Sequence, residues 1–297
     1  MRRIALLTDF GTRDPYVASM KGVLAARTAV AVEDLTHEIA PFDVWEAAWF
    51  LRTAAPWWPV GTIFVCVVDP GVGSGRRILA AEVGEQVFLA PDNGLLTFVV
   101  GAMGRIGEAP AASKSDVSPV AHESPVSDES HRSHLSHRSD RLFSVENTAL
   151  FLPGTSTTFH GRDRFAPVAA ALANGLPLEE LGPPVTELKT LSYEAPVIEG
   201  DITRGTVVHI DRFGNVITDV EPPSAPYALT AGALTIDRIE TSYAEAAPGP
   251  FLIAGSGGTV EISVSNANAA KDLQLSRGDR LVVWRIPPHP RGESSRR

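Results

Sequence analysis

This sequence has little cysteine, fewer positive than negative charges and no long apolar run. Its single cysteine, Cys66, lies in the apolar run TIFVCVV, which excludes a disulfide framework or a cysteine-based metal cage and favours a reducing cytoplasm. The 35 acidic side chains outnumber the 26 basic ones, and the net charge of -9 disfavours nucleic acid and anionic lipid as partners. No apolar stretch approaches the ~18 residues of a membrane span, and the N-terminus reaches an acid too early for a signal peptide. We therefore expect a soluble, unexported protein whose partners are small molecules or proteins.

The first two thirds of the chain carry an α/β pattern. The 297 residues, 44% of them hydrophobic, suffice for two domains that each bury a core. Short apolar runs rich in β-branched residues predict strands buried on both faces, at Ile4–Leu7, Ile63–Val68 and Val87–Ala90. Amphipathic segments at 15–26 and 43–53 predict helices, and Asp43 is expected to cap the second. The pattern predicts an α/β domain with a mainly parallel sheet over residues 1–196.

The rest of the chain differs in composition. Residues 109–142 are rich in Ser, His, Asp, Glu and Arg; they hold four of the eight histidines, but we expect a disordered, solvated insertion and not a metal-binding tract. The segment DRFAPVAAALANG then predicts a helix capped by Asp163. Beyond it, turn-separated β-rich pieces predict a small all-β barrel or sandwich over 197–286, followed by a disordered tail, 287–297.

Three of the expected buried strands are followed by an aspartate. These are Asp9 in LLTDFG, Asp69 in VVDPGVGSGRR and Asp92 in LAPDNG. Ligands of open α/β sheets bind beyond the carboxyl ends of the strands, so the three carboxylates could converge on one crevice. The alternative is that each aspartate serves only its local turn.

Other polar groups in these motifs suggest water activation. Arg76 follows Asp69 by seven residues, and His160 precedes a predicted helix in TFHGRDRF. An acid, an arginine and a histidine could together bind and polarise a water molecule. The alternative is a hard-cation site, although no paired ligand spacing such as H-x-x-x-H supports it. Its ligands would be Asp9, Asp14, Asp69, Asp92 and His160. A phosphate loop at GVGSGRR is disfavoured because the Lys-Ser/Thr ending of a P-loop is missing.

In these motifs the sequence resembles the S-adenosyl-L-methionine (SAM) hydroxide adenosyltransferases, relatives of the fluorinase and chlorinase. The matching segments are TDFGTRDPYVASMKGV, VVDPGVGSGRR, APDNGLLT, VENTALFLPGTSTTFHGRDRFAPVAAALA, IDRFGNVITDV and NANAA. The resemblance implies an N-terminal α/β domain, a C-terminal β-barrel, and a homotrimer whose sites lie between one subunit's first domain and its neighbour's second. It implies an enzyme that hydrolyses SAM to adenosine and L-methionine by attack of water at ribose C5′. SAM is then the substrate, and neither a cofactor nor a metal is expected.

The resemblance also implies site residues. The catalytic set would be Asp69, Arg76 and His160. Asp9 would hold the ribose hydroxyls. The methionine and nucleoside would contact Asp211, Phe213 and Asn215, and the adenine would lie near Asn268 and Ala269. Further substrate-binding candidates are Asp14, Asn93, Thr158, Phe159 and Ser256.

Departures from the halogenase pattern favour water as the nucleophile. Halogenases of this family carry a tyrosine at the position of Asp69 and a halide-binding serine at that of Gly161. Asn266 occupies a position where relatives often have arginine, so the contacts to adenine are expected to differ from those of the relatives. The alternatives are a halide-using halogenase, a non-catalytic SAM or adenosine sensor, a methyltransferase, which would need a methyl acceptor, and metal-dependent phosphoester hydrolysis.

Overall fold

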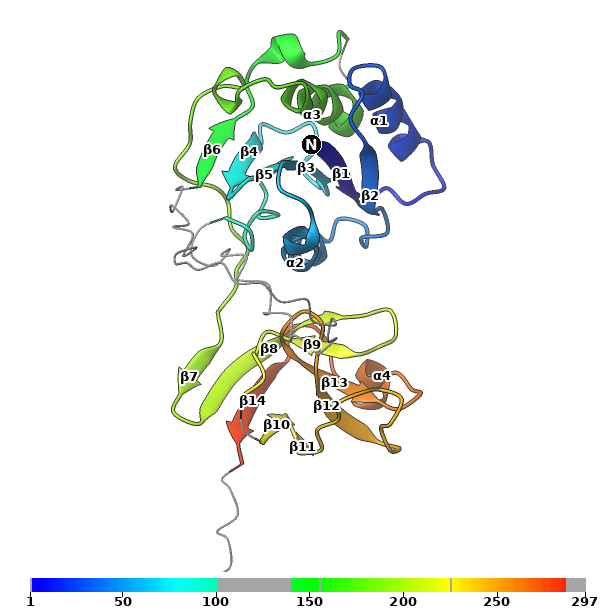
Figure 1. The fold of residues 1–297 in the computed structure, drawn as a ribbon, viewed down its shortest axis with the longest axis vertical. Coiled ribbons are helices and arrows are strands. Elements are labelled where there is room, and N and C mark those ends of the chain that lie inside the picture. The colour runs from blue at the N-terminus through cyan, green and yellow to red at the C-terminus, as the bar shows by residue number, and fades with distance from the viewer. Residues whose placement is uncertain (1, 101–139, 155, 225, 287–297) are drawn as a thin grey trace, which may run out of the picture. The chain divides into compact units, whose positions relative to one another are not determined.

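The chain folds into two compact units, Met1–Leu191 and Ser192–Arg297 (Figure 1). The computed structural model describes residues 2–100, 140–154, 156–224 and 226–286. The expected tail and most of the expected insertion at 109–142 lie outside these residues; Arg141 and Leu142, at the end of that segment, begin a strand of the first unit. Within the described ranges, no helix is long and apolar enough to cross a membrane.

The first unit is a layered α/β structure around one six-stranded sheet. Its strands are β1 (Arg3–Thr8), β2 (Val32–Thr36), β3 (Thr62–Val67), β4 (Ile78–Val83), β5 (Gln86–Pro91) and β6 (Arg141–Ser144). Its helices are α1 (Tyr16–Ala25), α2 (Val44–Ala54) and α3 (Ala166–Ala173), with short turns η1 (Ala55–Trp57), η3 (Thr148–Leu150), η4 (Gly161–Phe165) and η5 (Leu178–Glu180). Figure 1 shows α1 and α3 on one face of the sheet and α2 on the other.

The sheet is mixed, so the expectation of a mainly parallel sheet is only partly confirmed. The strand order is β2-β1-β3-β5-β4-β6, in which β2, β1, β3 and β5 are parallel neighbours. Strand β4 runs antiparallel to both β5 and β6. The reason is local: only Gly84 and Glu85 separate β4 from β5, and a two-residue connection can only join antiparallel strands.

Burial of the central strands on both faces is confirmed. In β1, Ile4 and Leu6 belong to the core cluster that includes residues of α1 and α3, whereas Ala5 and Leu7 belong to the cluster that includes residues of α2. All four are fully buried. Two apolar layers therefore fix the sheet, and its strand ends are held in place for the site described below.

The helix starts are partly as expected. Asp43 caps α2, accepting a 2.9 Å hydrogen bond from the Glu46 amide, as predicted. Asp163, however, is not the cap of α3. It lies inside the π-helical turn η4, where its carboxylate accepts from the Ser156 amide and pairs with Arg162. Pro167 lacks the N–H that would continue the helical pattern to the Asp163 carbonyl, which instead accepts from the Leu152 amide at 2.9 Å.

The second unit is a nearly closed antiparallel sheet, in keeping with the expected barrel. Its elements are β7 (Val197–Glu199), β8 (Ile202–Ile210), β9 (Val216–Thr218), β10 (Tyr227–Ala231), β11 (Leu234–Ile236), β12 (Pro250–Ala254), β13 (Val260–Val264), α4 (Ala269–Asp272) and β14 (Arg280–Arg285). The order is β11-β10-β14-β8-β9-β13-β12, with β7 beside β8. Because the end strands β11 and β12 contact each other, the sheet curls around one apolar core.

Candidate active site

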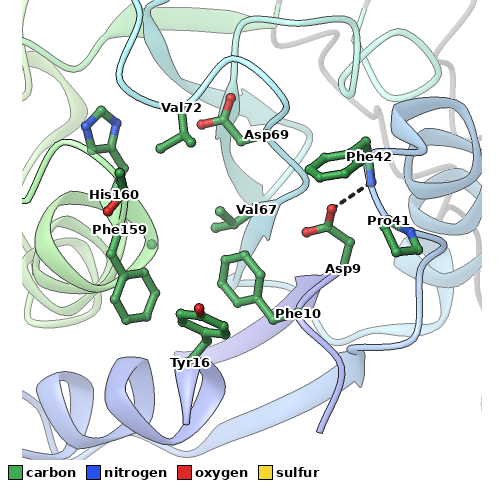
Figure 2. A pocket seen from close by; sticks show the side chains of 12 residues that line it. Asp9, Phe10, Tyr16, Pro41, Phe42, Val67, Asp69, Val72, Phe159 and His160 are labelled. Atoms are coloured by element: carbon green, nitrogen blue, oxygen red, sulfur yellow. Dashed lines mark hydrogen bonds between the residues drawn. The ribbon is translucent and has the colours of Figure 1, made fainter. Parts of the chain in front are cut away.

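A cavity of about 380 Å³ opens in the first unit beyond the carboxyl ends of β1 and β3 (Figure 2). It is lined by the loop after β1, the loop before α2, the loop after β3 and the turn that leads into η4. Open α/β sheets bind ligands at this edge. Asp9 and Asp69 both line the cavity, so the predicted convergence of strand-end acids is confirmed for these two residues.

Asp69, Arg76 and His160 form one buried cluster at the cavity. The Arg76 Nε donates to Asp69 Oδ1 at 2.7 Å, and its Nη2 donates to Asp69 Oδ2. The same Nη2 lies 3.1 Å from His160 Nδ1. The side chains of Asp69 and Arg76 are 4% and 5% exposed. Charge-assisted, two-pronged pairing in a desolvated setting fixes all three groups in one geometry.

A tight turn after β3 brings Arg76 to His160. The Ser74 hydroxyl donates to the Gly71 carbonyl at 2.6 Å, and Gly73 has a φ of 82°. A Cβ on Gly73 would lie 2.6 Å from the Thr157 carbonyl oxygen, so only glycine lets this turn pack against the TSTTFHG segment. The turn therefore aligns Arg76 with His160, which is 84 residues away in the sequence.

The contact with Arg76 fixes the proton on His160. A guanidinium only donates hydrogen bonds, so Nδ1 is the acceptor and a neutral ring carries its proton on Nε2. Burial, with the positive charges of Arg164 and Arg76, lowers the pKa of His160 despite the opposing charges of Asp69 and Asp163. His160 is thus held neutral. Its Nε2 is buried, without a hydrogen-bond partner among the described residues.

Asp9 lines the cavity on the side away from His160. Its Oδ2 accepts a 2.9 Å hydrogen bond from the Phe42 amide, as Figure 2 shows. Phe42 has a φ of 68°, unusual for a residue with a side chain, and the residue is 68% exposed. Sequence reasoning missed Phe42. The available signal was its place in APFD, directly ahead of the capping Asp43.

An aromatic wall closes another side of the cavity. The rings of Phe10, Tyr16 and Phe159 contact one another with centroids 5.2 to 6.0 Å apart. Phe159 and its neighbour Thr158 line the cavity as expected, whereas Phe10 and Tyr16 were not singled out, although they belong to the same TDFGTRDPY motif. Such a wall suits an apolar ligand surface and excludes water.

Two candidate acids and one amide lie elsewhere. Asp92 pairs with Arg77 through bonds of 2.9 and 2.6 Å and accepts from the Lys189 amide, so its predicted place in the crevice is wrong. Its partner Arg77 follows Arg76 in the chain and points to a different carboxylate. Asn93 does not line the cavity; its Nδ2 donates to the Val68 carbonyl and holds the end of β3 just before Asp69. Asp14 is exposed and outside the cavity lining.

The described residues do not gather as a cation site. They contain no group of three or more His, Cys, Asp or Glu side chains able to hold a metal ion. The five rival ligands named from the sequence are instead divided among Arg76, Arg77, the Phe42 amide and solvent.

The remaining candidates belong to the second unit. Asp211 accepts from the amides of Phe213 and Asn215 and from the Asn215 side chain, all at 2.8 to 2.9 Å, so it shapes the turn. Gly214, with a φ of 90°, touches the side chain of Asn268, which caps α4. The Phe-Gly-Asn turn and the start of α4 therefore form one surface. Phe213 is 77% exposed on it, Ala269 is buried beneath it, and Ser256 is exposed in the β12–β13 turn.

Comparison with known proteins gives one family for both units. The model of the SAM hydroxide adenosyltransferase N-terminal domain matches residues 4–134 and 128–182, and that of the C-terminal domain matches 205–282. A Thermus thermophilus protein named (R)-S-adenosyl-L-methionine hydrolase is 36% identical over 288 residues, covering 94% of this chain and 98% of its own. A fluorinase of Actinoplanes sp. is 25% identical and covers 94% and 96%. The crystal structure of an uncharacterized conserved protein from Thermotoga maritima has a TM-score of 0.77 at 30% identity, covering 95% and 100%.

Proposed function

The chain belongs to the SAM hydroxide adenosyltransferase family, and from this premise we propose that it hydrolyses SAM to adenosine and L-methionine. The observation that carries the proposal is the buried cluster of Asp69, Arg76 and His160 at the cavity. A water molecule there attacks ribose C5′. The C5′–S bond breaks with its electron pair going to sulfur, and the sulfonium leaves as the neutral thioether of methionine.

Because the leaving group is already activated, alignment and desolvation are the main tasks of the enzyme. Both Asp69 oxygens accept from Arg76, yet each carboxylate oxygen has a second lone pair for a water O–H. Asp69 therefore orients the water and receives its proton, which passes on to solvent. His160, whose Nδ1 is engaged by Arg76, keeps the guanidinium and hence Asp69 in place.

The cavity walls supply substrate binding. Asp9, whose Oδ2 is already fixed by the Phe42 amide, holds the ribose hydroxyls. The aromatic wall and the Phe42 ring shield the sulfonium and C5′ from bulk water. We place this cavity in a homotrimer, where the second unit of a neighbouring subunit contacts the nucleoside and methionine. The contacting surface is the exposed Phe213 with Asn215, Asn268 and Ala269.

Water is preferred to halide on two grounds. The hydrolase relative is 36% identical and the fluorinase 25%. In addition, a Cβ on Gly161 would lie 3.0 Å from Met20 Sδ and 3.3 Å from the Phe10 ring, so a halide-binding serine would crowd this position. The chain thus lacks the hydroxyl, and a serine would fit here only if the Met20 and Phe10 side chains shifted by a few tenths of an ångström.

The setting of the reaction is the cytoplasm. The one cysteine, Cys66, is a buried free thiol whose pKa is raised by burial, so it is inert and needs no oxidising compartment.

A product assay tests this function. Incubation with SAM is expected to yield adenosine and methionine in equal amounts, measured by liquid chromatography with mass detection. S-Adenosylhomocysteine in their place would indicate methyl transfer. Binding of SAM without turnover would indicate a sensor, and a 5′-halo-5′-deoxyadenosine formed only with added halide would indicate a halogenase.

A further inference from the structure

His37 is a buried histidine that the mechanism above does not use. It follows β2 directly, is 5% exposed and does not line the cavity. Its Nδ1 lies 2.8 Å from the hydroxyl of Thr8, the last residue of β1 and the neighbour of Asp9. Thr8 is fully buried as well. A buried polar pair of this kind is costly unless each hydrogen bond is satisfied, so the direction of the bonds can be worked out.

The hydrogen bonds run in one direction. The Thr8 hydroxyl oxygen accepts from the Phe10 amide at 3.2 Å, and its own hydrogen is available for His37 Nδ1. Nδ1 is then the acceptor, and the ring proton sits on Nε2. That atom lies 3.0 Å from Asp34 Oδ1, off the line of an ideal hydrogen bond, and Asp34 is paired with Lys21 at 2.6 Å. The carboxylate favours the Nε2–H tautomer electrostatically.

These bonds join the two loops that form the Asp9 side of the cavity. One loop follows β1 and carries Asp9 and Phe10; the other follows β2 and carries Phe42. Besides the Thr8–His37 contact, the Gly11 amide donates to the His37 carbonyl at 2.8 Å, and the Phe42 amide donates to Asp9. The left-handed backbone of Phe42 persists only where its surroundings hold it.

We propose that His37 is a positioning residue, which through Thr8 fixes the carboxylate of Asp9 for the ribose hydroxyls. The inference rests on the proposed function, because the ribose is the ligand assigned to Asp9. A histidine that only fills the core would stabilise the fold without affecting how the cavity distinguishes one sugar from another.

Two substitutions separate the two ring nitrogens. In His37→Asn the amide can replace Nδ1 and keep the Thr8 link, whereas in His37→Gln it can replace Nε2 and keep only the Asp34 side. Thr8→Val removes the same link from the other end with little change of shape, but it also removes the acceptor of the Phe10 amide, so His37→Gln is the more specific test. Thermal denaturation identifies any variant that does not fold. If one of the three variants does not fold, the remaining two still test the Thr8–His37 link.

The readout is the ratio of the Kd values for 2′,3′-dideoxyadenosine and adenosine, measured by titration calorimetry. We expect His37→Gln and Thr8→Val to lower this ratio about tenfold, the effect of about one hydrogen bond to a charged group, and His37→Asn to retain most of it. An unchanged ratio in folded His37→Gln and Thr8→Val would overturn the proposal. So would an equal loss in His37→Asn and His37→Gln.

Hydrogen exchange separates this proposal from the proposed function. Without any ligand, residues 8–11 and 40–44 should exchange faster in His37→Gln than in His37→Asn or the wild type. Failure of the wild-type protein to bind adenosine would refute the assigned ligand, while exchange would still show whether His37 holds the loops. Equal exchange in all proteins would refute the positioning role itself.

Discussion

Arg76 contacts both Asp69 and His160, so these three side chains depend on one another at the scale of single residues. Asp69→Asn keeps the size of the side chain but removes its charge. We expect kcat to fall about 10²–10⁴-fold, the usual range for acid–base groups, while the Kd for SAM changes little because the proposed role of Asp69 is to orient the water and not to bind SAM. Stopped assays give kcat and calorimetry gives Kd. The exposed Asp237, which follows β11, is changed to Asn as the control; similar losses in both variants would contradict the assignment.

His160 gives a pH prediction whose sign follows from its lowered pKa. Between that pKa and the ordinary value of about 6.5, the unfolded chain binds a proton that the folded site resists, so stability falls as pH decreases through this window. Turnover follows, because protonation breaks the bond from Arg76 to Nδ1. We expect the acidic limb of the kcat profile below pH 6.5.

His160→Asn is the matched variant for this prediction, because its amide can accept from Arg76 but does not titrate. The acidic limb should disappear in this variant if His160 produces it. A limb that persists unchanged in His160→Asn would assign the titration to another group.

Among single residues, the sequence predicts those whose position is set by the strand that directly precedes them. Asp9 and Asp69 follow buried strands directly, so strand ends alone locate them at the cavity. Asp92 has the same signal, but it forms an ion pair with Arg77. The local sequence does not show which carboxylate pairs with Arg76 and which with Arg77. Phe42 and His37 depend on how the loop after β2 folds against β1, a long-range contact without a motif of its own.

At the scale of elements, the turn after β3 depends on Gly73. Gly73→Ala would place a methyl group 2.6 Å from the Thr157 carbonyl and shift the turn that carries Arg76. We expect kcat to fall at least tenfold, measured in the same stopped assay. Gly84→Ala is the matched control, since Gly84 also has a positive φ, 60°, but has open space around it. It should lose only about 1 kcal/mol of stability in urea denaturation, with kcat unchanged. Equal kcat in the two variants would contradict the role of the turn.

Elements with a strong local signal are predicted well, and those decided by neighbours are not. The cap of α2 by Asp43 needs only its own sequence. The π-helical turn before α3 is held by contacts of Asp163. Its carboxylate accepts from the Ser156 amide and pairs with Arg162, and its carbonyl accepts from the Leu152 amide. The antiparallel direction of β4 had a readable signal in the two-residue connection Gly84–Glu85, which the α/β pattern concealed.

At the scale of the whole molecule, the proposed trimer has a direct test. If each site combines one subunit's first unit with its neighbour's second, Asp69→Asn and Phe213→Ala damage different halves of the site. Co-expressed in equal amounts, the two variants should recover activity at about a quarter of the sites, by random assembly. The assay uses SAM far below the KM of Phe213→Ala, and light scattering gives the mass. No recovery in mixed trimers would place both halves of a site in one subunit.

The two-domain architecture could be predicted from the sequence because composition and periodicity change along the chain. Buried β-branched runs indicate the α/β unit, and turn-separated β pieces indicate the nearly closed sheet of the second. The identity of the substrate could not be predicted from such patterns. Carboxylates at strand ends serve many reactions, and only several motifs in the right order distinguish this family.

The central claim is that water attacks ribose C5′ at the Asp69–Arg76–His160 cluster. Incubation with SAM in ¹⁸O-labelled water, followed by mass spectrometry of the products, tests it most directly. The mechanism predicts one ¹⁸O atom in the 5′-hydroxyl of adenosine and none in methionine, because the C5′–S bond is the one that breaks. Unlabelled adenosine, or S-adenosylhomocysteine as the main product, would contradict it.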